Sequence, residues 1–366
     1  MSVFDTKTNP AICVLPWVHE YKSIENGVAP CCQSHRKFND GEDIEQVRQS
    51  MLRGKRHDIC TRCYDSEAES GWSFRIHETR DWIKKFGEPD VHNPKVQHID
   101  IRFDPTCNLK CKMCGPHNST LWQKEKNVKI TSSNYNKEYF KQIDKKILKK
   151  IYLAGGEPTY IREYLDFLLE LNEVNPDCEV MINTNLKKLP ENWKYLIKKL
   201  DKLTVICSCD AIEDLGSYVR YPLVWQEFEE NVKYVSENAN FLQFNLVANN
   251  LTSHKIDSTC EWMQQYSNNI NLSVLYSPKV FSEVAIPPEV RQTYLDSIEK
   301  IQKFKVSIQY AGRFRSEAND LLNKYKNAPY DKTVHEALRQ EIEEQDSHRT
   351  MQLKDVDPFL HSWIFK

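Results

Sequence analysis

The chain has little glycine, no long apolar run and almost no net charge. Only 10 of its 366 residues are glycine, and its 50 basic and 52 acidic side chains leave a net charge of −2. A charge balance this even gives no bulk positive field to favour nucleic acid or an anionic membrane surface. No apolar run approaches the ~18 residues of a membrane span. The first residues, MSVFDTKTNP, lack the order of a secretory signal. We therefore expect a cytoplasmic protein that binds neither membrane nor nucleic acid.

Cysteine, in contrast, is abundant, with twelve residues. Disulfides are disfavoured in a reducing compartment, where clustered cysteines more often bind metal or carry redox chemistry. Four cysteines lie in or beside apolar runs and are expected to be small buried hydrophobic side chains: Cys178, Cys207, Cys209 and Cys260. The other eight lie within the first 114 residues: Cys13, Cys31, Cys32, Cys60, Cys63, Cys107, Cys111 and Cys114.

The pattern of the chain changes near residue 96. Residues 1–95 are rich in cysteine and poor in apolar periodicity, and FGEPDVHNP (86–94) has the composition of a linker. Beyond it, short β-type runs alternate with amphipathic helical stretches, which indicates βαβ units and a parallel sheet. Six strands are predicted, at 96–103, 150–155, 179–185, 202–210, 242–250 and 271–278.

The expected fold class is therefore α/β, a partial (β/α)6 TIM-like barrel over 96–284. A cysteine-rich module (1–95) precedes it and a helical extension (285–366) follows it. In parallel α/β barrels the functional site lies at the carboxyl ends of the strands. Polar residues do follow each predicted strand: Cys107, then Gly155-Gly156-Glu157, Asn183-Thr184-Asn185, Ser208 with Asp210, Asn249, and Ser277.

The stretch FDPTCNLKCKMCGPHNSTLW (103–122) holds three cysteines in the spacing C-x3-C-x2-C. A fully ligated iron–sulfur cluster uses four cysteines, so three thiolates leave one metal position open, as catalytic metal sites do. A structural zinc site requires a fourth ligand, and His117 is the candidate. A second motif, LAGGEP (153–158), places two of the rare glycines at a strand end. Such a pair indicates a tight turn or the close approach of a ligand.

Together the two motifs resemble the radical S-adenosylmethionine (radical SAM) enzymes. The resemblance implies a 4Fe–4S cluster on Cys107, Cys111 and Cys114, whose open iron chelates the amino and carboxylate groups of S-adenosylmethionine. It also implies cofactor contacts from other residues. The GGEP element would hold the methionine amino group, Met113 would lie near the adenine, and Arg220 would pair with the methionine carboxylate. The residues concerned are Met113, Gly155, Gly156, Glu157, Asn185, Ser208 and Arg220.

The N-terminal cysteines form a second set. Cys60 and Cys63 have the C-x2-C spacing of a metal site, and Cys13 with the pair Cys31-Cys32 can complete four thiolates. The spacing accommodates either a closed zinc site or a second iron–sulfur cluster. The pattern is similar to the twitch or SPASM-like modules of some radical SAM enzymes. That resemblance implies an auxiliary 4Fe–4S cluster, with Cys31 favoured over Cys32 because Cys31 follows Pro30.

The resemblance implies reductive cleavage of S-adenosylmethionine to a 5′-deoxyadenosyl radical that abstracts a substrate hydrogen atom. A reductant such as flavodoxin or ferredoxin is then required, and Asp210 and Asp104 are candidate general bases. A peptide or protein is the expected substrate, and oxidation of a small molecule, a sugar or cyclitol, is the alternative. Two readings with zinc stay open: an active barrel with zinc in the N-terminal set, and a zinc-stabilised binding protein without catalysis.

Overall fold

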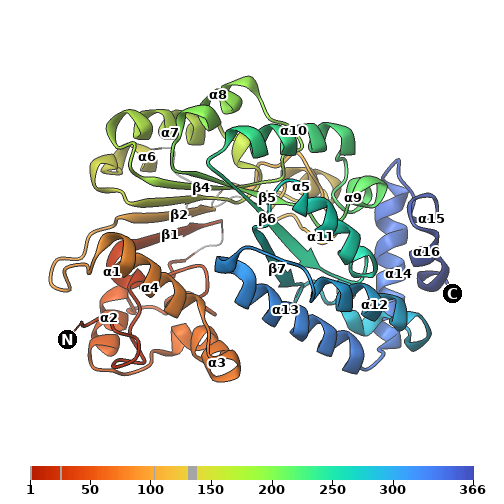
Figure 1. Cartoon of the computed structure of the whole chain (residues 1–366), viewed down its shortest axis with the longest axis horizontal. Coiled ribbons are helices and arrows are strands. Elements are labelled where there is room, and N and C mark those ends of the chain that lie inside the picture. The colour runs from red at the N-terminus through yellow and green to blue at the C-terminus, as the bar shows by residue number, and fades with distance from the viewer. Residues whose placement is uncertain (1, 25–26, 103, 131–137) are drawn as a thin grey trace. The chain divides into compact units, whose positions relative to one another are not determined.

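The computed structural model of the chain describes residues 2–24, 27–102, 104–130 and 138–366. The chain divides into two compact units, each made of two separate stretches. Unit 1 comprises residues 1–105 and 130–181, and unit 2 comprises 106–129 and 182–366. The strands follow one another in the sheet in chain order, β1 to β7 (Figure 1). The α/β class is therefore confirmed, while the boundaries at 95 and 284 remain a prediction.

Unit 1 contains the cysteine-rich segment and the first strands of the sheet. Its elements are α1 (Leu15–Val18), β1 (His19–Ser23), α2 (Ile44–Leu52), α3 (Thr61–Ser70), α4 (Phe74–Phe86), β2 (His98–Arg102), α6 (Tyr139–Gln142), β3 (Lys150–Leu153), α7 (Arg162–Val174) and the start of β4 (Glu179–Thr184). The predicted strands at 96–103, 150–155 and 179–185 are confirmed as β2, β3 and β4.

Strand β1 was not predicted from the sequence. Its residues, HEYKS, are mostly polar, and only Ser23 is buried. It pairs in parallel with β2, with Tyr21 opposite Asp100, and β2 pairs in parallel with β3, with Asp100 opposite Tyr152. The cysteine-rich segment therefore contributes a strand to the sheet. A half-exposed polar strand carries no apolar alternation, which is why its sequence gives no strand signal.

The cysteine-rich segment also has a hydrophobic core of its own. Trp17 is 1% exposed, and its ring meets that of Phe4 edge-on at 5.2 Å. Around them lie buried residues from α1, α2, α4, the segment before α1 and the turn before α3, namely Ile12, Cys13, Val14, Leu15, Val18, Val47, Met51, Ile59 and Trp82. Cys13 is thus anchored in a packed core, which fixes its backbone before any metal binds.

Unit 2 contains the end of β4, the remaining strands and most of the helices. Its elements are α5 (Thr120–Glu125), α8 (Glu191–Lys199), β5 (Leu203–Ser208), α9 (Glu213–Val219), α10 (Trp225–Asn238), β6 (Phe241–Ala248), α11 (Ile256–Gln264), β7 (Ile270–Val274), α12 (Arg291–Ile301), α13 (Ile308–Asn327), α14 (Lys332–Ser347), α15 (Leu353–Val356) and α16 (Pro358–Ile364). β5 pairs in parallel with β6 and β6 with β7. The last three predicted strands are confirmed.

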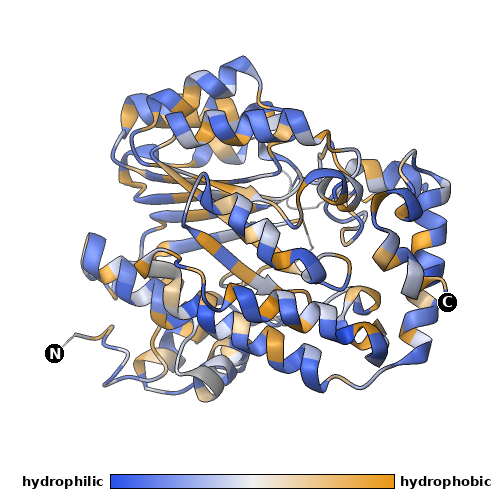
Figure 2. Cartoon of the chain, turned by 45° about the vertical axis from the view of Figure 1, so that its right-hand side comes forward, coloured by the Kyte–Doolittle hydropathy of each residue, from blue (hydrophilic) through white to orange (hydrophobic). Residues whose placement is uncertain are grey.

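The long helices are amphipathic, as their sequences predict. In α10 the buried residues Trp225, Phe228, Val232 and Val235 recur every three or four positions and form one face. Helices in Figure 2 accordingly alternate hydrophobic and hydrophilic residues along their length. The four cysteines expected to be structural, Cys178, Cys207, Cys209 and Cys260, are all buried. Among the described residues, no helix is both long and apolar enough to cross a membrane.

The C-terminal helices are fixed to unit 2 by a buried carboxylate. Asp357 is 1% exposed, and its Oδ2 lies 2.9 Å from His254 Nε2 and 2.7 Å from Lys255 Nζ. Its Oδ1 accepts the backbone N–H of Leu360 and so caps α16. Burial alone would raise the pKa of Asp357, but the hydrogen bond and charge of His254 outweigh it and lower this pKa. The carboxylate is therefore held in its charged form.

We expect Asp357→Asn to lower the free energy of unfolding by about 3 kcal/mol at pH 7, because it breaks a buried ion pair. A carboxyl group with a lowered folded pKa stabilises the protein above its unfolded pKa of roughly 3.9, and this stabilisation is lost as the pH falls. The difference between variant and wild type should therefore shrink below pH 4. Urea unfolding followed by circular dichroism measures it. Asp355→Asn, at an exposed position of α15, is the control, and equal losses in both variants would contradict the assignment.

Candidate functional site

In unit 2 the three cysteines of the C-x3-C-x2-C loop are half-buried and are held by a set of hydrogen bonds. Ser119 caps α5 by accepting the Trp122 N–H at 3.3 Å, and its hydroxyl donates to the Leu109 carbonyl at 2.6 Å. The Trp122 indole Nε1 donates to the Cys111 carbonyl at 2.9 Å. The first turn of α5 therefore holds the backbone of the cysteine loop.

Asn185, at the end of β4, is the predicted rim residue that reaches this loop. It is 6% exposed, and its Nδ2 donates to Asn108 Oδ1 at 2.8 Å and lies 3.8 Å from Cys107 Sγ. Three other residues were predicted to contact the cofactor or a metal. Ser208 donates to Asn183 Oδ1 at 3.2 Å, Met113 is half-buried, and His117, the possible zinc ligand, is exposed. The cofactor contacts of Ser208, Met113 and Asn185 remain predictions.

Arg220 lies beside the cysteine loop with one donor unused. It is 8% exposed, and its Nη1 donates to Asp210 Oδ2 at 2.6 Å. Its Nε is buried and has no hydrogen-bond partner among the described residues. Burial raises the pKa of the Cys111 and Cys114 thiols, and the Arg220 charge opposes this at both. A buried cation with a free donor beside two thiols suits an anionic ligand.

Both carboxylate oxygens of Asp210, a predicted general base, accept hydrogen bonds in the structure. One carboxylate oxygen binds Arg220, and the other accepts the Val247 N–H at 3.1 Å. With both oxygens engaged, Asp210 orients the guanidinium. Its role as a base remains a prediction.

Residues that sequence reasoning missed hold the loop from the far end of the chain. Lys112, between the second and third cysteines, is 1% exposed, and its Nζ lies 2.7 Å from Asp346 Oδ1 in α14. The same Nζ sits 3.9 Å from the centre of the Tyr218 ring. Burial lowers the pKa of Lys112 to about 8, against the opposing effect of Asp346. A lysine inside a cysteine motif resembles a solvent-exposed residue in sequence, so no signal indicated this pair.

Arg349, just beyond α14, adds a second cation to this contact. It is 6% exposed, and its guanidinium lies 5.1 Å from the Trp122 ring centre and 5.5 Å from that of Tyr221. Its Nη2 is 3.5 Å from Glu125 Oε1. Gln345 also donates to the Lys112 carbonyl at 3.3 Å. The C-terminal helices are thus part of the support of the cysteine loop.

In unit 1 the GGEP element forms a tight turn after β3. Gly155 has φ +112°, and a Cβ there would lie 2.9 Å from the Asp104 carbonyl oxygen. That carbonyl accepts the Gly156 N–H at 2.9 Å. Glu157 is 1% exposed, and its Oε1 accepts from Thr159 N at 3.1 Å and Thr159 Oγ1 at 2.7 Å. The turn requires glycine, as the motif predicts. Asp104 supports it through its backbone, and its role as a base remains a prediction.

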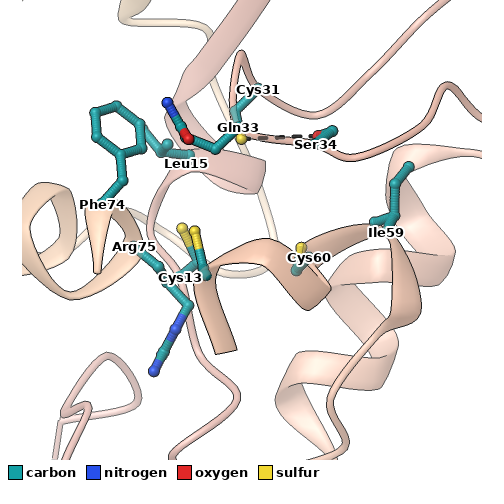
Figure 3. Close-up of a pocket in the computed structure, with 10 residues that line it drawn as sticks. Cys13, Leu15, Cys31, Gln33, Ser34, Ile59, Cys60, Phe74 and Arg75 are labelled. Atoms are coloured by element: carbon teal, nitrogen blue, oxygen red, sulfur yellow. Dashed lines mark hydrogen bonds between the residues drawn. The ribbon is translucent and has the colours of Figure 1, made fainter. Parts of the chain in front are cut away.

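The N-terminal cysteines of unit 1 line one cavity (Figure 3). We call it the four-cysteine cavity, because Cys13, Cys31, Cys60 and Cys63 all line it. The rest of its lining consists of three apolar residues, two polar ones and one cation: Leu15, Ile59 and Phe74, Gln33 and Ser34, and Arg75. Four thiols from three separate segments converge on one enclosed space, which is the donor set of a closed metal site.

Hydrogen-bond donors point at these sulfur atoms. The backbone N–H groups of Leu15 and Arg75 lower the pKa of the Cys13 and Cys63 thiols, respectively. The Ser34 N–H donates to the Cys31 carbonyl at 3.2 Å, and the Ser34 hydroxyl lies 3.8 Å from the Cys31 sulfur. Burial raises the pKa of all four thiols, to about 11 for Cys31; nearby donors oppose this at Cys13, Cys31 and Cys63, and the Arg75 charge opposes it at Cys60. Thiols are weak acceptors, so such a set suits thiolates bound to metal.

The structure separates Cys31 from Cys32. Cys31 lines the cavity, whereas Cys32 does not. Burial raises the pKa of the Cys32 thiol, and the nearest charges acting on it are Asp100 and Arg102 of β2. This arrangement supports the prediction that Cys31 is the ligand of the pair.

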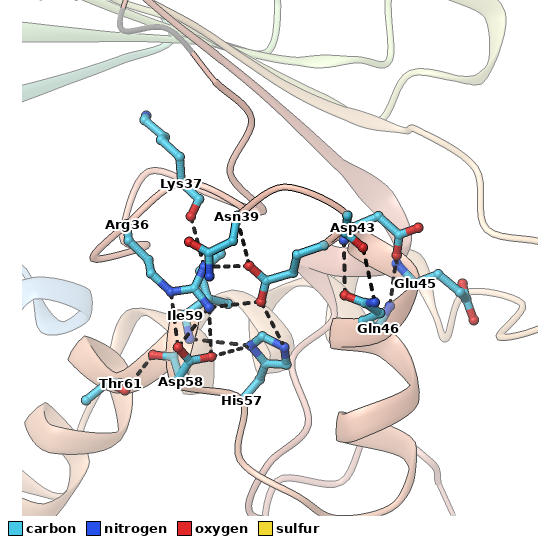
Figure 4. A network of polar contacts seen from close by, with 12 residues as sticks. Arg36, Lys37, Asn39, Asp43, Glu45, Gln46, His57, Asp58, Ile59 and Thr61 are labelled. Carbon is cyan, nitrogen blue, oxygen red and sulfur yellow. Dashed lines mark hydrogen bonds and ion pairs between the residues drawn. The ribbon is translucent and has the colours of Figure 1, made fainter.

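An ion-pair network joins two of the cysteine-bearing segments (Figure 4). Arg36 donates to Glu42 through Nη1 at 2.5 Å and to Asp58 through Nη2 at 2.8 Å, and His57 Nδ1 lies 3.1 Å from Asp58 Oδ1. The Arg36 hydrogen bond lowers the pKa of Glu42 to about 2. Arg36 follows Cys31 closely and Asp58 precedes Cys60, so the network holds both segments at the cavity. The guanidinium lies between the two carboxylates and offsets part of their negative charge.

Comparison with known families identifies the class of protein. Residues 101–263 match the family model described as the Radical SAM superfamily. This stretch contains both the C-x3-C-x2-C loop and the GGEP turn. Residues 101–263 therefore match the radical SAM superfamily, as the sequence predicted, and the prediction of an enzyme agrees with this match.

The similar curated proteins share only part of their length with this chain. A GTP 3′,8-cyclase of Nautilia profundicola is 26% identical over 107 residues, 29% of this chain and 33% of that protein. The enzyme of the same name from Campylobacter lari is 21% identical over 171 residues, 46% of this chain and 51% of that protein. The chain thus spans between a third and about half of the length of these relatives.

Two solved structures resemble the fold at low identity. One is described as native anSMEcpe with bound AdoMet, with a TM-score of 0.42, 17% identity, and coverage of 58% of this chain and 63% of that one. The other is Streptococcus suis SuiB bound to S-adenosylmethionine, with a TM-score of 0.42, 15% identity, and coverage of 72% and 64%.

A radical SAM domain implies a 4Fe–4S cluster, S-adenosylmethionine and a reductant. The residues of this chain fit the cluster and its ligand. Cys107, Cys111 and Cys114 supply three thiols on a braced loop, and Arg220 offers a buried, unpartnered Nε beside two of them. In unit 1, Gly155 permits the tight GGEP turn, in which a Cβ would meet the Asp104 carbonyl.

We expect Asp346→Asn to destabilise the protein by about 3–5 kcal/mol, because it leaves the Lys112 ammonium buried without its partner. The loosened loop should also retain less iron. Urea unfolding and iron analysis of anaerobically purified protein test this. Glu344→Gln is the matched control, since Glu344 pairs with Lys126 at the exposed surface. Equal behaviour of the two variants would contradict the brace, and Lys112→Met combined with Asp346→Leu should recover the stability.

Gly155→Ala should destabilise the turn by about 1–3 kcal/mol, because alanine is strained at φ +112° and its Cβ meets the Asp104 carbonyl. Binding of radiolabelled S-adenosylmethionine, measured by equilibrium dialysis, should weaken as well. Gly312→Ala is the control, since nothing lies within 4 Å of a Cβ there. In an exposed helix this change is neutral or stabilising by up to about 1 kcal/mol. Unchanged stability and binding in Gly155→Ala would refute the assigned role of the turn.

Proposed function

We propose that the chain is a radical SAM enzyme with a second, auxiliary 4Fe–4S cluster, acting on a peptide or protein. The observation that carries this proposal is the four-cysteine cavity, which occurs in the same chain as a radical SAM domain. Three cysteines on one loop leave a metal position open for a substrate, whereas four cysteines around a cavity close the other site. The chain thus offers one catalytic and one closed site.

Cys107, Cys111 and Cys114 would hold the catalytic cluster. When bound, this group delivers one electron from a flavodoxin- or ferredoxin-type reductant to S-adenosylmethionine, which breaks into methionine and a 5′-deoxyadenosyl radical. The radical then takes a hydrogen atom from a substrate carbon and becomes 5′-deoxyadenosine. The protein contributes position and exclusion of water.

Individual residues have distinct tasks in this proposal. The free Nε of Arg220 donates to the methionine carboxylate, while Asp210 keeps the guanidinium oriented. Gly155, Gly156 and Glu157 hold the methionine amino group through backbone and carboxylate. Asn185 fixes the cysteine loop through Asn108 and Cys107.

The N-terminal site resembles a twitch or SPASM-like module and would hold the auxiliary cluster on Cys13, Cys31, Cys60 and Cys63. Because all four of its ligands come from the protein, it has no open position for a substrate. A cluster held in this way would be suited to electron transfer. Loss of a hydrogen atom to the radical, followed by loss of a proton to a base and an electron to this cluster, makes the net reaction a two-electron oxidation of the substrate.

The resemblance to auxiliary-cluster modules supports a peptide or protein substrate. Oxidation of a sugar or cyclitol by the same chemistry is the alternative. Since the similar curated proteins are named GTP 3′,8-cyclases, GTP belongs in a first screen with peptides and sugars. The assay measures 5′-deoxyadenosine with and without each compound, and the Cys107→Ala, Cys111→Ala, Cys114→Ala triple variant should form none.

The adjacent cysteines provide a sharp test of the auxiliary cluster. Anaerobically reconstituted wild type and Cys32→Ala should each contain about eight irons and eight sulfides per chain. Cys31→Ala should fall to about four, because it removes a ligand of one cluster. Four irons plus one zinc in the wild type would overturn the auxiliary cluster and leave the radical SAM site. Zinc alone would overturn the radical SAM function as well.

A further inference from the structure

A buried ion pair lies at the edge of the four-cysteine cavity. Arg75, at the start of α4, is 2% exposed, and Glu67 of α3 faces it with both carboxylate oxygens. Arg75 Nε donates to Oε1 at 2.9 Å and Nη2 donates to Oε2 at 2.6 Å. The remaining Nη1 donates to the Ile12 carbonyl, next to Cys13. Every guanidinium nitrogen is therefore fixed by a bond to a segment near a cysteine.

The pair is close to the thiols in space as well as in sequence. Arg75 lines the cavity, and in Figure 3 its side chain starts beside Cys13 and extends away from the enclosed space. Its backbone N–H lowers the pKa of the Cys63 thiol. Its charge acts on Cys13, Cys60 and Cys63, while the nearby carboxylate of Glu67 acts on Cys63 with the opposite sign. A fixed positive charge and a fixed negative charge thus flank the same group of ligands.

We propose that the Arg75–Glu67 pair sets the reduction potential of the auxiliary cluster, with Arg75 raising it and Glu67 lowering it. The inference rests on the auxiliary cluster of the proposed function. Reduction adds one negative charge to the site, so a nearby cation stabilises the reduced form and a nearby anion destabilises it. The Arg75 side chain is 3% exposed and that of Glu67 11%. Because hydrogen bonds also fix both groups, water and salt screen these charges less than they screen charges at the surface. Charge and hydrogen bonding are the known determinants of iron–sulfur potentials.

The same surroundings indicate the direction of electron flow. The donors to Cys13, Cys31 and Cys63 also stabilise added negative charge on sulfur. The Arg75 charge is among the main effects involving three of the four ligands, and the Glu67 charge is among those at Cys63. Both features raise the potential, which suits a site that accepts an electron from the substrate. Arg75 and Glu67 are accordingly positioning residues, since neither has to touch the substrate.

The test is a redox titration of this cluster alone. In the full-length chain, Cys107, Cys111 and Cys114 are replaced by alanine, and the reduced N-terminal cluster is followed by electron paramagnetic resonance. In this background Arg75→Met should lower the equilibrium constant for one-electron reduction at least tenfold, about 59 mV. Glu67→Gln should raise it at least tenfold. Arg75→Lys keeps the charge and should stay within threefold of the parent.

The opposite signs distinguish this role from a structural one, because a general loosening of the fold does not move two partners in opposite directions. Glu78→Gln is the matched control: it removes the carboxylate of another buried ion pair in unit 1, with Lys150 at 3.0 Å, outside the cavity lining. It should change the constant less than threefold.

The outcomes separate the two proposals. A background protein without iron would overturn the auxiliary cluster, and this inference with it. Two other results would overturn this inference but leave the auxiliary cluster in place. One is a change of less than threefold in the equilibrium constant for reduction in Glu67→Gln. The other is a change in the same direction in Glu67→Gln and Arg75→Met. If Arg75→Met does not retain its cluster, Glu67→Gln and Arg75→Lys still decide: a rise in the first and none in the second supports the inference, and any other pattern overturns it.

Discussion

Burial of charge is the constraint on which both cysteine sites depend. Burial raises the pKa of the thiols in both sites, from Cys13 in unit 1 to Cys111 in unit 2, which opposes the thiolate form that binds metal. The protein compensates with fixed donors and cations placed next to sulfur. Each cation in turn requires a buried anion, because an unpaired charge in a water-poor interior is costly. The pairs Arg220–Asp210 and Arg75–Glu67 meet this requirement.

This requirement explains why distant parts of the chain meet at the cysteines. Lys112 lies within the cysteine loop. The carboxylate that pairs with its ammonium group belongs to Asp346, 234 residues later. The C-terminal helices are therefore a component of the radical SAM site's support. In unit 1 the same principle acts over a shorter range, where Arg36 joins the Cys31 segment to Asp58 and hence to Cys60. Ion pairs of this kind fix the ligands before metal arrives, which reduces the ordering cost of binding.

The two cysteine sites differ in whether the protein supplies every metal ligand, and this difference suits them to different roles. A three-cysteine loop, with the unpartnered Nε of Arg220 beside it, is suited to hold a metal group and an anionic ligand together. The four-cysteine cavity is complete in protein ligands and is suited to electron transfer. A radical generated at one site and an electron accepted at the other would combine into a net oxidation. Substrate identity then depends on surfaces that neither cysteine motif encodes.

The sequence by itself determined what depends on local pattern. Six strands, the C-x3-C-x2-C loop and the GGEP turn were readable because strand periodicity, ligand spacing and glycine at φ +112° are properties of neighbouring residues. Only the tertiary structure decided which sulfur of the pair Cys31-Cys32 faces the cavity and that Asp210 holds Arg220. It alone also showed the buried partner of Lys112 and the polar strand β1. Those features depend on side-chain direction and on partners far apart in the chain, which spacing does not encode.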